Sequence, residues 1–162
     1  MPNPSSIPVH DGVPGPGSGW LPMGRVREVE ALLRSWGLGD RHASASCSWV
    51  VTEASAYLAA DRRAGPPLPA ARPSWLRSVE RGSPGGETGD ERRLAAYVLA
   101  VAGVFATATG KHPDRLVGAA ERHSFEQFLI ACLRLIVPLV TPDAAQAIRR
   151  RTFDVRGRRF YA

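Results

Sequence analysis

The segment LAAYVLAVAGVFATA, residues 94–108, contains no charged side chain and combines alanines with larger apolar residues. Tyr97, Val98, Val101, Val104 and Phe105 recur at spacings of three and four, which is typical of one apolar helix face. The segment therefore predicts a central helix that is buried on several sides, and an all-α fold around it.

A membrane span is the alternative interpretation of this apolar stretch. Extended to Gly110 it holds 17 residues, the lower limit of the roughly 17–25 that cross a bilayer, and it includes Gly103 and two threonines. A buried core helix fits these features better, so we do not expect contact with a membrane.

Further amphipathic segments lie on both sides of it. We expect helices at residues 23–36, 43–63, 114 or 121 to 137, and 143–151, with a short one at 74–81. Gly37 and Gly39 should end the first helix, and Asp90 should cap the central one. Thr141 followed by Pro142 is a helix start, with Thr141 as the N-cap.

Two of these helices have predicted core faces that include a cysteine. The faces are Cys47, Val50, Val51, Ala54, Tyr57 and Leu58, and Phe125, Phe128, Leu129, Cys132, Leu135 and Ile136. Free buried thiols behave as small apolar side chains and suit a reducing compartment, so we expect a cytoplasmic protein. One disulfide between the two cysteines is the alternative.

The chain of 162 residues fits a single domain. Residues 1–21 are rich in proline and glycine and have no signal-peptide pattern, so we predict a disordered arm. Residues 22–151 should form a bundle of five or six helices, with a long Pro/Gly-rich connection at 66–89. We expect residues 152–162 to form a basic aromatic tail or a short hairpin.

Positive charge is concentrated at the C-terminus. Of the 21 basic residues only Lys111 is lysine, so part of the formal net charge of +6 reflects a general preference for arginine. From residue 148 onward, however, a single acidic residue accompanies six arginines: Arg149, Arg150, Arg151, Arg156, Arg158 and Arg159. Guanidinium groups match carboxylate and phosphate oxygens, and nearby Phe160 and Tyr161 can stack on bases or cover apolar surface. We predict these eight residues as the binding site.

The structure of this C-terminal segment has two interpretations. A turn at Arg156-Gly157 pairs Phe153 with Phe160 and Thr152 with Tyr161, which is coherent for a hairpin. A helix followed by a basic hairpin is similar to the winged helix-turn-helix of DNA-binding regulators. The other interpretation is an extended tail whose aromatic rings pack on the bundle.

No motif for metal, cofactor or covalent chemistry is present. His123 and Glu126 lie three residues apart, but di-metal bundles need Glu-x-x-His on two helices. Gly110-Lys111 is followed by His112, where a phosphate-binding loop has serine or threonine. We therefore predict neither a metal nor a cofactor.

The expected function is that of a non-catalytic binding or accessory protein. It would be a small helical subunit of a larger assembly that contacts a polyanion or an acidic protein partner through the arginine-rich C-terminus. A nucleic-acid-binding regulator is the second hypothesis. An enzyme whose pocket no local motif reveals is the third.

Overall fold

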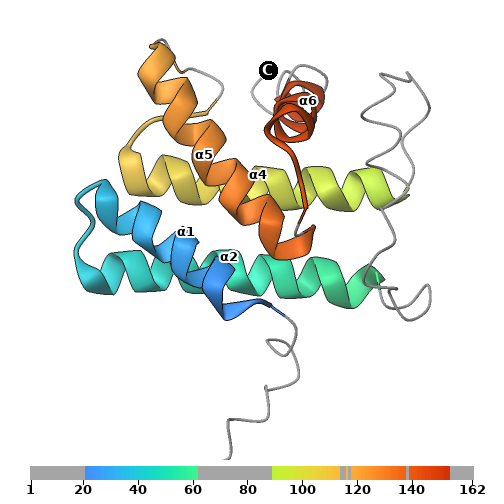
Figure 1. Cartoon of the computed structure of the whole chain (residues 1–162), viewed down its shortest axis with the longest axis horizontal. Coiled ribbons are helices and arrows are strands. Elements are labelled where there is room, and N and C mark those ends of the chain that lie inside the picture. Colours follow the sequence, from blue (N-terminus) through green and yellow to red (C-terminus); the bar gives the residue numbers. More distant parts are fainter. Residues whose placement is uncertain (1–20, 62–88, 114–115, 117, 138, 154–162) are drawn as a thin grey trace, which may run out of the picture.

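The computed structural model describes residues 21–61 and 89–153, except 114, 115, 117 and 138. This part of the chain contains five helices and no strand, which confirms the all-α prediction (Figure 1). The helices are α1 (Met23–Ser35), α2 (Asp40–Asp61), α4 (Gly89–Thr109), α5 (Ala119–Ile136) and α6 (Pro142–Thr152). The predicted short helix at 74–81, the connection that includes it, the N-terminal arm before residue 21 and the tail beyond residue 153 lie outside the described residues.

Helix ends follow the local signals at most positions. Gly37 adopts a φ of 80° directly after the last turn of α1, a conformation that glycine reaches without steric cost. The Thr141 hydroxyl accepts a hydrogen bond from the Ala144 amide at 3.2 Å, as expected of an N-cap. Asp90 is not a cap, because α4 already begins at Gly89. α2 begins at Asp40, where a carboxylate suits the positive end of the helix.

The helices form two layers. α2 and α4 lie side by side and antiparallel, and α1, α5 and α6 cover one face of that pair (Figure 1). The Tyr57 and Tyr97 rings, 6.0 Å apart, and a 3.5 Å hydrogen bond from Arg93 Nη1 to the Ala60 carbonyl fix the register of α2 against α4.

The central helix is α5, and this corrects the prediction that residues 94–108 occupy the centre. α5 packs against each of the other four described helices. α4 is exposed along the face that carries Ala96, Gly103 and Thr107. The side chains there are so small that little apolar surface meets water, although the sequence of α4 is apolar all round.

The core contains the residues that the sequence assigned to it. Trp36, which follows α1 and is half-buried, packs against this core: the Phe105 and Phe128 ring centroids lie 5.2 and 5.3 Å away, and Phe125 lies 5.1 Å from Phe105. Val51 and Leu58 are only half-buried at the edge of α2. The other predicted core residues are buried: Cys47, Val50, Ala54, Tyr57, Tyr97, Val98, Val101, Val104, Phe105, Phe125, Phe128, Leu129, Cys132, Leu135 and Ile136. Both cysteines are free, so the disulfide alternative does not describe this structure.

One described helix is long and apolar enough to cross a bilayer by length and composition. It is α4, over Glu91–Thr109, and 44% of its most apolar window is buried by neighbouring helices. Core helices of bundles share this composition.

Candidate anion-binding site

The C-terminal arginines begin on α6, a helix that the Thr141 cap and Pro142 start at a defined position. Ala144, Ala145, Ile148 and Thr152 form its buried face. Arg149, Arg150 and Arg151 occupy its last turn, where positive charge is favoured by the helix dipole. Successive helical residues point about 100° apart, so the three guanidinium groups leave the helix in different directions.

Two of these arginines pair with carboxylates of the same chain. Arg151 Nη2 lies 3.2 and 3.1 Å from the two carboxylate oxygens of Glu91 on α4. Arg149 Nε lies 3.5 Å from Glu126 Oε1 on α5, within ion-pair range but without hydrogen-bond geometry. Glu91 is only 8% exposed. These contacts hold α6 against both neighbouring helices.

Arg150 differs from both of its neighbours. Its side chain is exposed, and in the described part of the chain it forms no ion pair or hydrogen bond. Among the predicted binding arginines that the structure describes, Arg150 is the one whose side chain is exposed to solvent. Arg156, Arg158, Arg159, Phe160 and Tyr161 lie outside the described residues.

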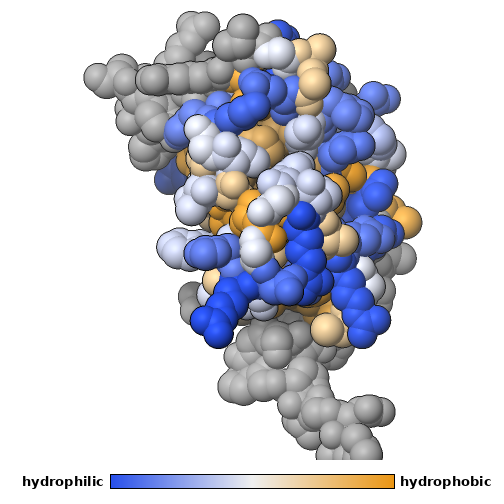
Figure 2. All heavy atoms as spheres, turned by 90° about the vertical axis from the view of Figure 1, so that its left-hand side faces the viewer, coloured by the Kyte–Doolittle hydropathy of each residue, from blue (hydrophilic) through white to orange (hydrophobic). Residues whose placement is uncertain are grey.

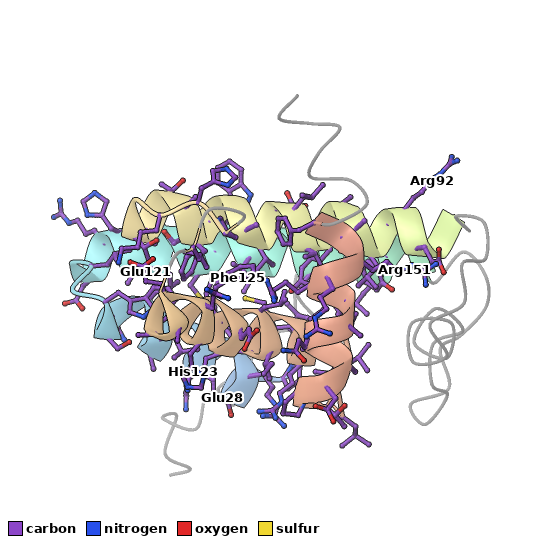
Figure 3. All side chains as sticks on the ribbon, turned by 90° about the horizontal axis from the view of Figure 1, so that it is seen from above. Glu28, Arg92, Glu121, His123, Phe125 and Arg151 are labelled. Carbon is purple, nitrogen blue, oxygen red and sulfur yellow. The ribbon has the colours of Figure 1, made fainter. Side chains whose placement is uncertain are left out.

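The last described residue, Phe153, is held against the bundle. The Phe153 ring, directly after α6, packs edge-on against Phe125 with centroids 6.0 Å apart. Further basic residues lie at the start of α4, which contacts α6: Arg93 is half-buried and Arg92 is exposed. Figure 3 shows Arg92 and Arg151 near the same end of the molecule.

α6 lacks the charge distribution of a DNA recognition helix. Recognition helices contact base edges with residues near their N-terminus. In α6 that end carries exposed Asp143, and the arginines lie at the opposite end. The hairpin on which the winged-helix similarity depends lies outside the described residues.

The two cysteine thiols and the Tyr97 side chain are buried in the core. Burial raises the pKa of the Cys132 thiol well above its ordinary value, and burial together with the Glu30 charge raises the pKa of Cys47. Burial also raises the pKa of Tyr97, whose hydroxyl donates a 2.6 Å hydrogen bond to the Cys132 carbonyl. Protonated, enclosed thiols are poor nucleophiles and poor metal ligands.

The residues considered for metal or phosphate chemistry do not come together in one site. His123 is exposed on α5, and Glu126 faces Arg149. Lys111 pairs with Glu121. Within the described ranges no three His, Cys, Asp or Glu side chains are grouped so as to hold a metal ion.

Two carboxylates of the site, and one exposed tryptophan outside it, could not be recognised from the predicted site residues. Glu91 and Glu126 are the carboxylates that neutralise Arg151 and Arg149, and the pairs span 60 and 23 residues, so no local pattern reveals them. Trp49 is exposed on α2, and its position opposite Cys47, Val50 and Ala54 on the helix was the available signal.

No family model, curated protein or solved structure matches this chain. The function is therefore inferred from the chemistry of its own residues.

Proposed function

We propose that the protein is a non-catalytic accessory subunit of the cytoplasm that contacts an acidic partner through its C-terminal arginines. The observation that carries this proposal is the difference in surroundings among the three arginines of α6. Arg149 and Arg151 are ion-paired to α5 and α4, whereas Arg150 between them is exposed and pairs with no other described residue. The two ion pairs fix the position of the last turn of α6, and Arg156, Arg158 and Arg159 come after this turn in the sequence.

An acidic protein is the better-supported partner. Asp143 at the start of α6 and the partial neutralisation of its arginines oppose the uniform positive surface that a nucleic-acid backbone requires. Carboxylates of a protein partner need only a few matched guanidinium groups, which supply specificity and speed of association.

The proposal is tested with the full chain and two anionic probes, labelled poly-L-glutamate and a mixed-sequence DNA duplex. The test variant replaces Arg150, Arg156, Arg158 and Arg159 with alanine. The control variant replaces four exposed arginines of α1, α2 and α5, Arg27, Arg34, Arg41 and Arg122, and so removes the same charge at a distance from the last turn of α6. Binding is measured by fluorescence anisotropy at low and high salt.

We expect poly-L-glutamate to bind the wild type and the control with similar affinity. Four lost ion pairs at about 0.5 kcal/mol each should weaken the test variant about 30-fold. Equal weakening of both variants would show that net charge alone binds the probe and would contradict the proposal. Binding of the duplex alone, with a steep salt dependence, would replace it with the nucleic-acid hypothesis.

A further inference from the structure

The α2/α4 layer has a surface of small and apolar side chains on the side away from α1, α5 and α6 (Figure 3). We call this surface the outer face. Between residues 43 and 60, α2 carries one charged side chain, that of Glu53, and α4 carries none from residue 94 to 109. The exposed residues of the outer face are Ala45, Trp49, Thr52, Ala56 and Ala59 of α2, and Ala96, Gly103 and Thr107 of α4.

Other parts of the described surface carry many charges of both signs. α1 exposes Arg27, Glu28 and Arg34, and α5 exposes Arg122 and His123. At the end of the molecule that includes the α1–α2 turn, strongly hydrophilic side chains surround smaller apolar areas (Figure 2). The outer face differs from these surfaces because its single charge is negative and lies among small or apolar side chains.

The Glu53 carboxylate is half-buried, and in the described part of the chain it forms no ion pair or hydrogen bond. The nearest basic side chain along the α2/α4 contact, Arg93, donates to the Ala60 carbonyl two turns away. The other glutamates that the structure describes each pair with a basic side chain: Glu28 with Arg25, Glu30 with Arg34, Glu91 with Arg151, Glu121 with Lys111, and Glu126 with Arg149. Among the described glutamates, Glu53 is therefore the one without a counter-charge.

The Glu53 carboxylate and the Trp49 indole are neighbours on α2. Residues four apart on a helix lie on the same face, about 5–6 Å from each other. The Trp49 side chain is 63% exposed. Glu53 lies toward α4, because its charge adds to the effect of burial in raising the pKa of Tyr97. The outer face thus presents an exposed aromatic ring next to an unmatched negative charge.

These two groups define what can cover the outer face. Tryptophan is among the residues most often found at the energetic centre of interfaces. An apolar surface, a lipid bilayer or an anionic partner that covered Trp49 would also take the Glu53 carboxylate out of water without a counter-charge, which is costly. A guanidinium group avoids this cost, since it can bind a carboxylate through two hydrogen bonds and stack on an indole ring.

We propose that the outer face binds an amphipathic helix of another protein whose apolar side includes one arginine. This inference goes beyond the proposed binding of an acidic partner. The arginine of the bound helix pairs with Glu53 and stacks on Trp49. Apolar side chains before and after that arginine cover the small residues of α2 and α4.

A helix suits this surface better than an extended peptide. Extended peptides commonly bind by adding a strand to a sheet edge, and the described part of the chain contains no strand. A helix satisfies its own backbone hydrogen bonds. Residues 43–60 of α2 extend over about 27 Å, enough for several turns of a bound helix. The small side chains of Ala56 and Ala96 allow the close approach of about 8–10 Å between helix axes.

The full chain is tested with two fluorescein-labelled helical peptides of about 18 residues, with blocked ends. Both peptides have one stripe of leucines and are otherwise built from alanine and glutamine. One carries a single arginine at the centre of the stripe, and the other carries glutamate there. In fluorescence anisotropy at micromolar concentrations, we expect the arginine peptide to bind the wild type at least tenfold more tightly than the glutamate peptide.

Two variants identify the groups that bind the arginine peptide. Glu53→Gln keeps the size of the side chain and removes its charge, and it should weaken binding about tenfold. Trp49→Ala should weaken binding at least tenfold through the lost apolar contact. Glu28→Gln and Met23→Ala are the matched controls, since both residues are exposed on α1, and they should bind as the wild type does. Circular dichroism checks that all four variants remain helical.

Reversal of the charge gives a result that a merely structural role of Glu53 would not produce. The variant Glu53→Arg should bind the glutamate peptide more tightly than the arginine peptide. A wild type that binds neither peptide, equal affinity for both peptides, or arginine-peptide binding that survives Glu53→Gln would each overturn the proposal.

Other occupants of the outer face have their own outcomes. Self-association of the wild type that Trp49→Ala abolishes would replace the proposal with a second copy of the chain. Trp49-dependent sedimentation with phosphatidylcholine vesicles would replace it with a membrane. Poly-L-glutamate binding through the C-terminal arginines should be the same in Glu53→Gln as in the wild type, so the two proposals fail separately.

Discussion

Arg149, Arg150 and Arg151 are consecutive in the sequence, yet each meets a different environment. Arg149 faces Glu126, Arg151 faces Glu91, and Arg150 faces solvent. The sequence could predict the run of charge and its position at a helix end. It could not predict the two carboxylates, because they come from helices whose packing against α6 is decided by the whole fold.

The Glu91–Arg151 pair should contribute to the stability of the folded chain. Removing one partner of a buried ion pair costs about 3–5 kcal/mol, but the Arg151 side chain is 29% exposed and Glu91 has further interactions. We therefore expect Arg151→Met to lower the free energy of unfolding by about 2 kcal/mol in urea denaturation. Arg150→Met, the adjacent control, should change it by no more than about 0.5 kcal/mol. Equal losses in both variants would contradict the pairing.

Tyr97 should make stability depend on pH in the alkaline range. Its pKa is raised by burial, so its stabilising contribution is present below the ordinary tyrosine pKa and is lost as the pH rises through the folded-state value. Tyr97→Phe removes the hydrogen bond to the Cys132 carbonyl and should cost about 1 kcal/mol at pH 7. Urea unfolding should show this deficit shrinking above about pH 10. A deficit that stays constant with pH would contradict the assignment.

At the scale of the element, helix positions were predictable because caps and breakers act locally. Gly37, Thr141 and Pro142 mark ends where the sequence placed them, since each acts through its own backbone conformation or a nearby amide. The prediction of Asp90 as an N-cap was wrong because the residue before it, Gly89, is already helical, so α4 begins ahead of Asp90. The sequence did not identify α5 as the central helix. A helix that is apolar all round can be enclosed by its neighbours, or it can expose a face of small side chains, as α4 does.

The N-cap Thr141 should stabilise the first turn of α6. Thr141→Ala removes the oxygen that accepts from the Ala144 amide and should destabilise the chain by about 1 kcal/mol. Thr141→Ser keeps the oxygen and should stay close to the wild type. Thermal unfolding followed by circular dichroism compares the three proteins, and similar losses for serine and alanine would show that the hydroxyl is not the cause.

At the scale of the whole molecule, one aromatic cluster joins the two layers. Phe105 of α4 contacts Trp36, which follows α1, and both Phe125 and Phe128 of α5. The sequence assigned the three phenylalanines to apolar helix faces, but spacing alone predicts a helix face and not the helix that covers it.

Loss of the Phe105 ring should therefore affect the whole bundle. Phe105→Ala removes a fully buried ring and should cost about 3–5 kcal/mol, a large part of the roughly 5–15 kcal/mol that stabilises a domain. Phe105→Leu refills most of the space and should cost much less. Urea denaturation measures both, and comparable losses would show that the cavity is not what matters.

The antiparallel register of α2 and α4 also determines how short the connection between them can be. The hydrogen bond from Arg93 to Ala60 shows that α2 ends where α4 begins. Two neighbouring ends can be joined by only a few residues, and helix hairpins commonly use about 2–8. A linker of that length, in place of the 27 residues between them, is therefore long enough to join α2 to α4 in the register described here.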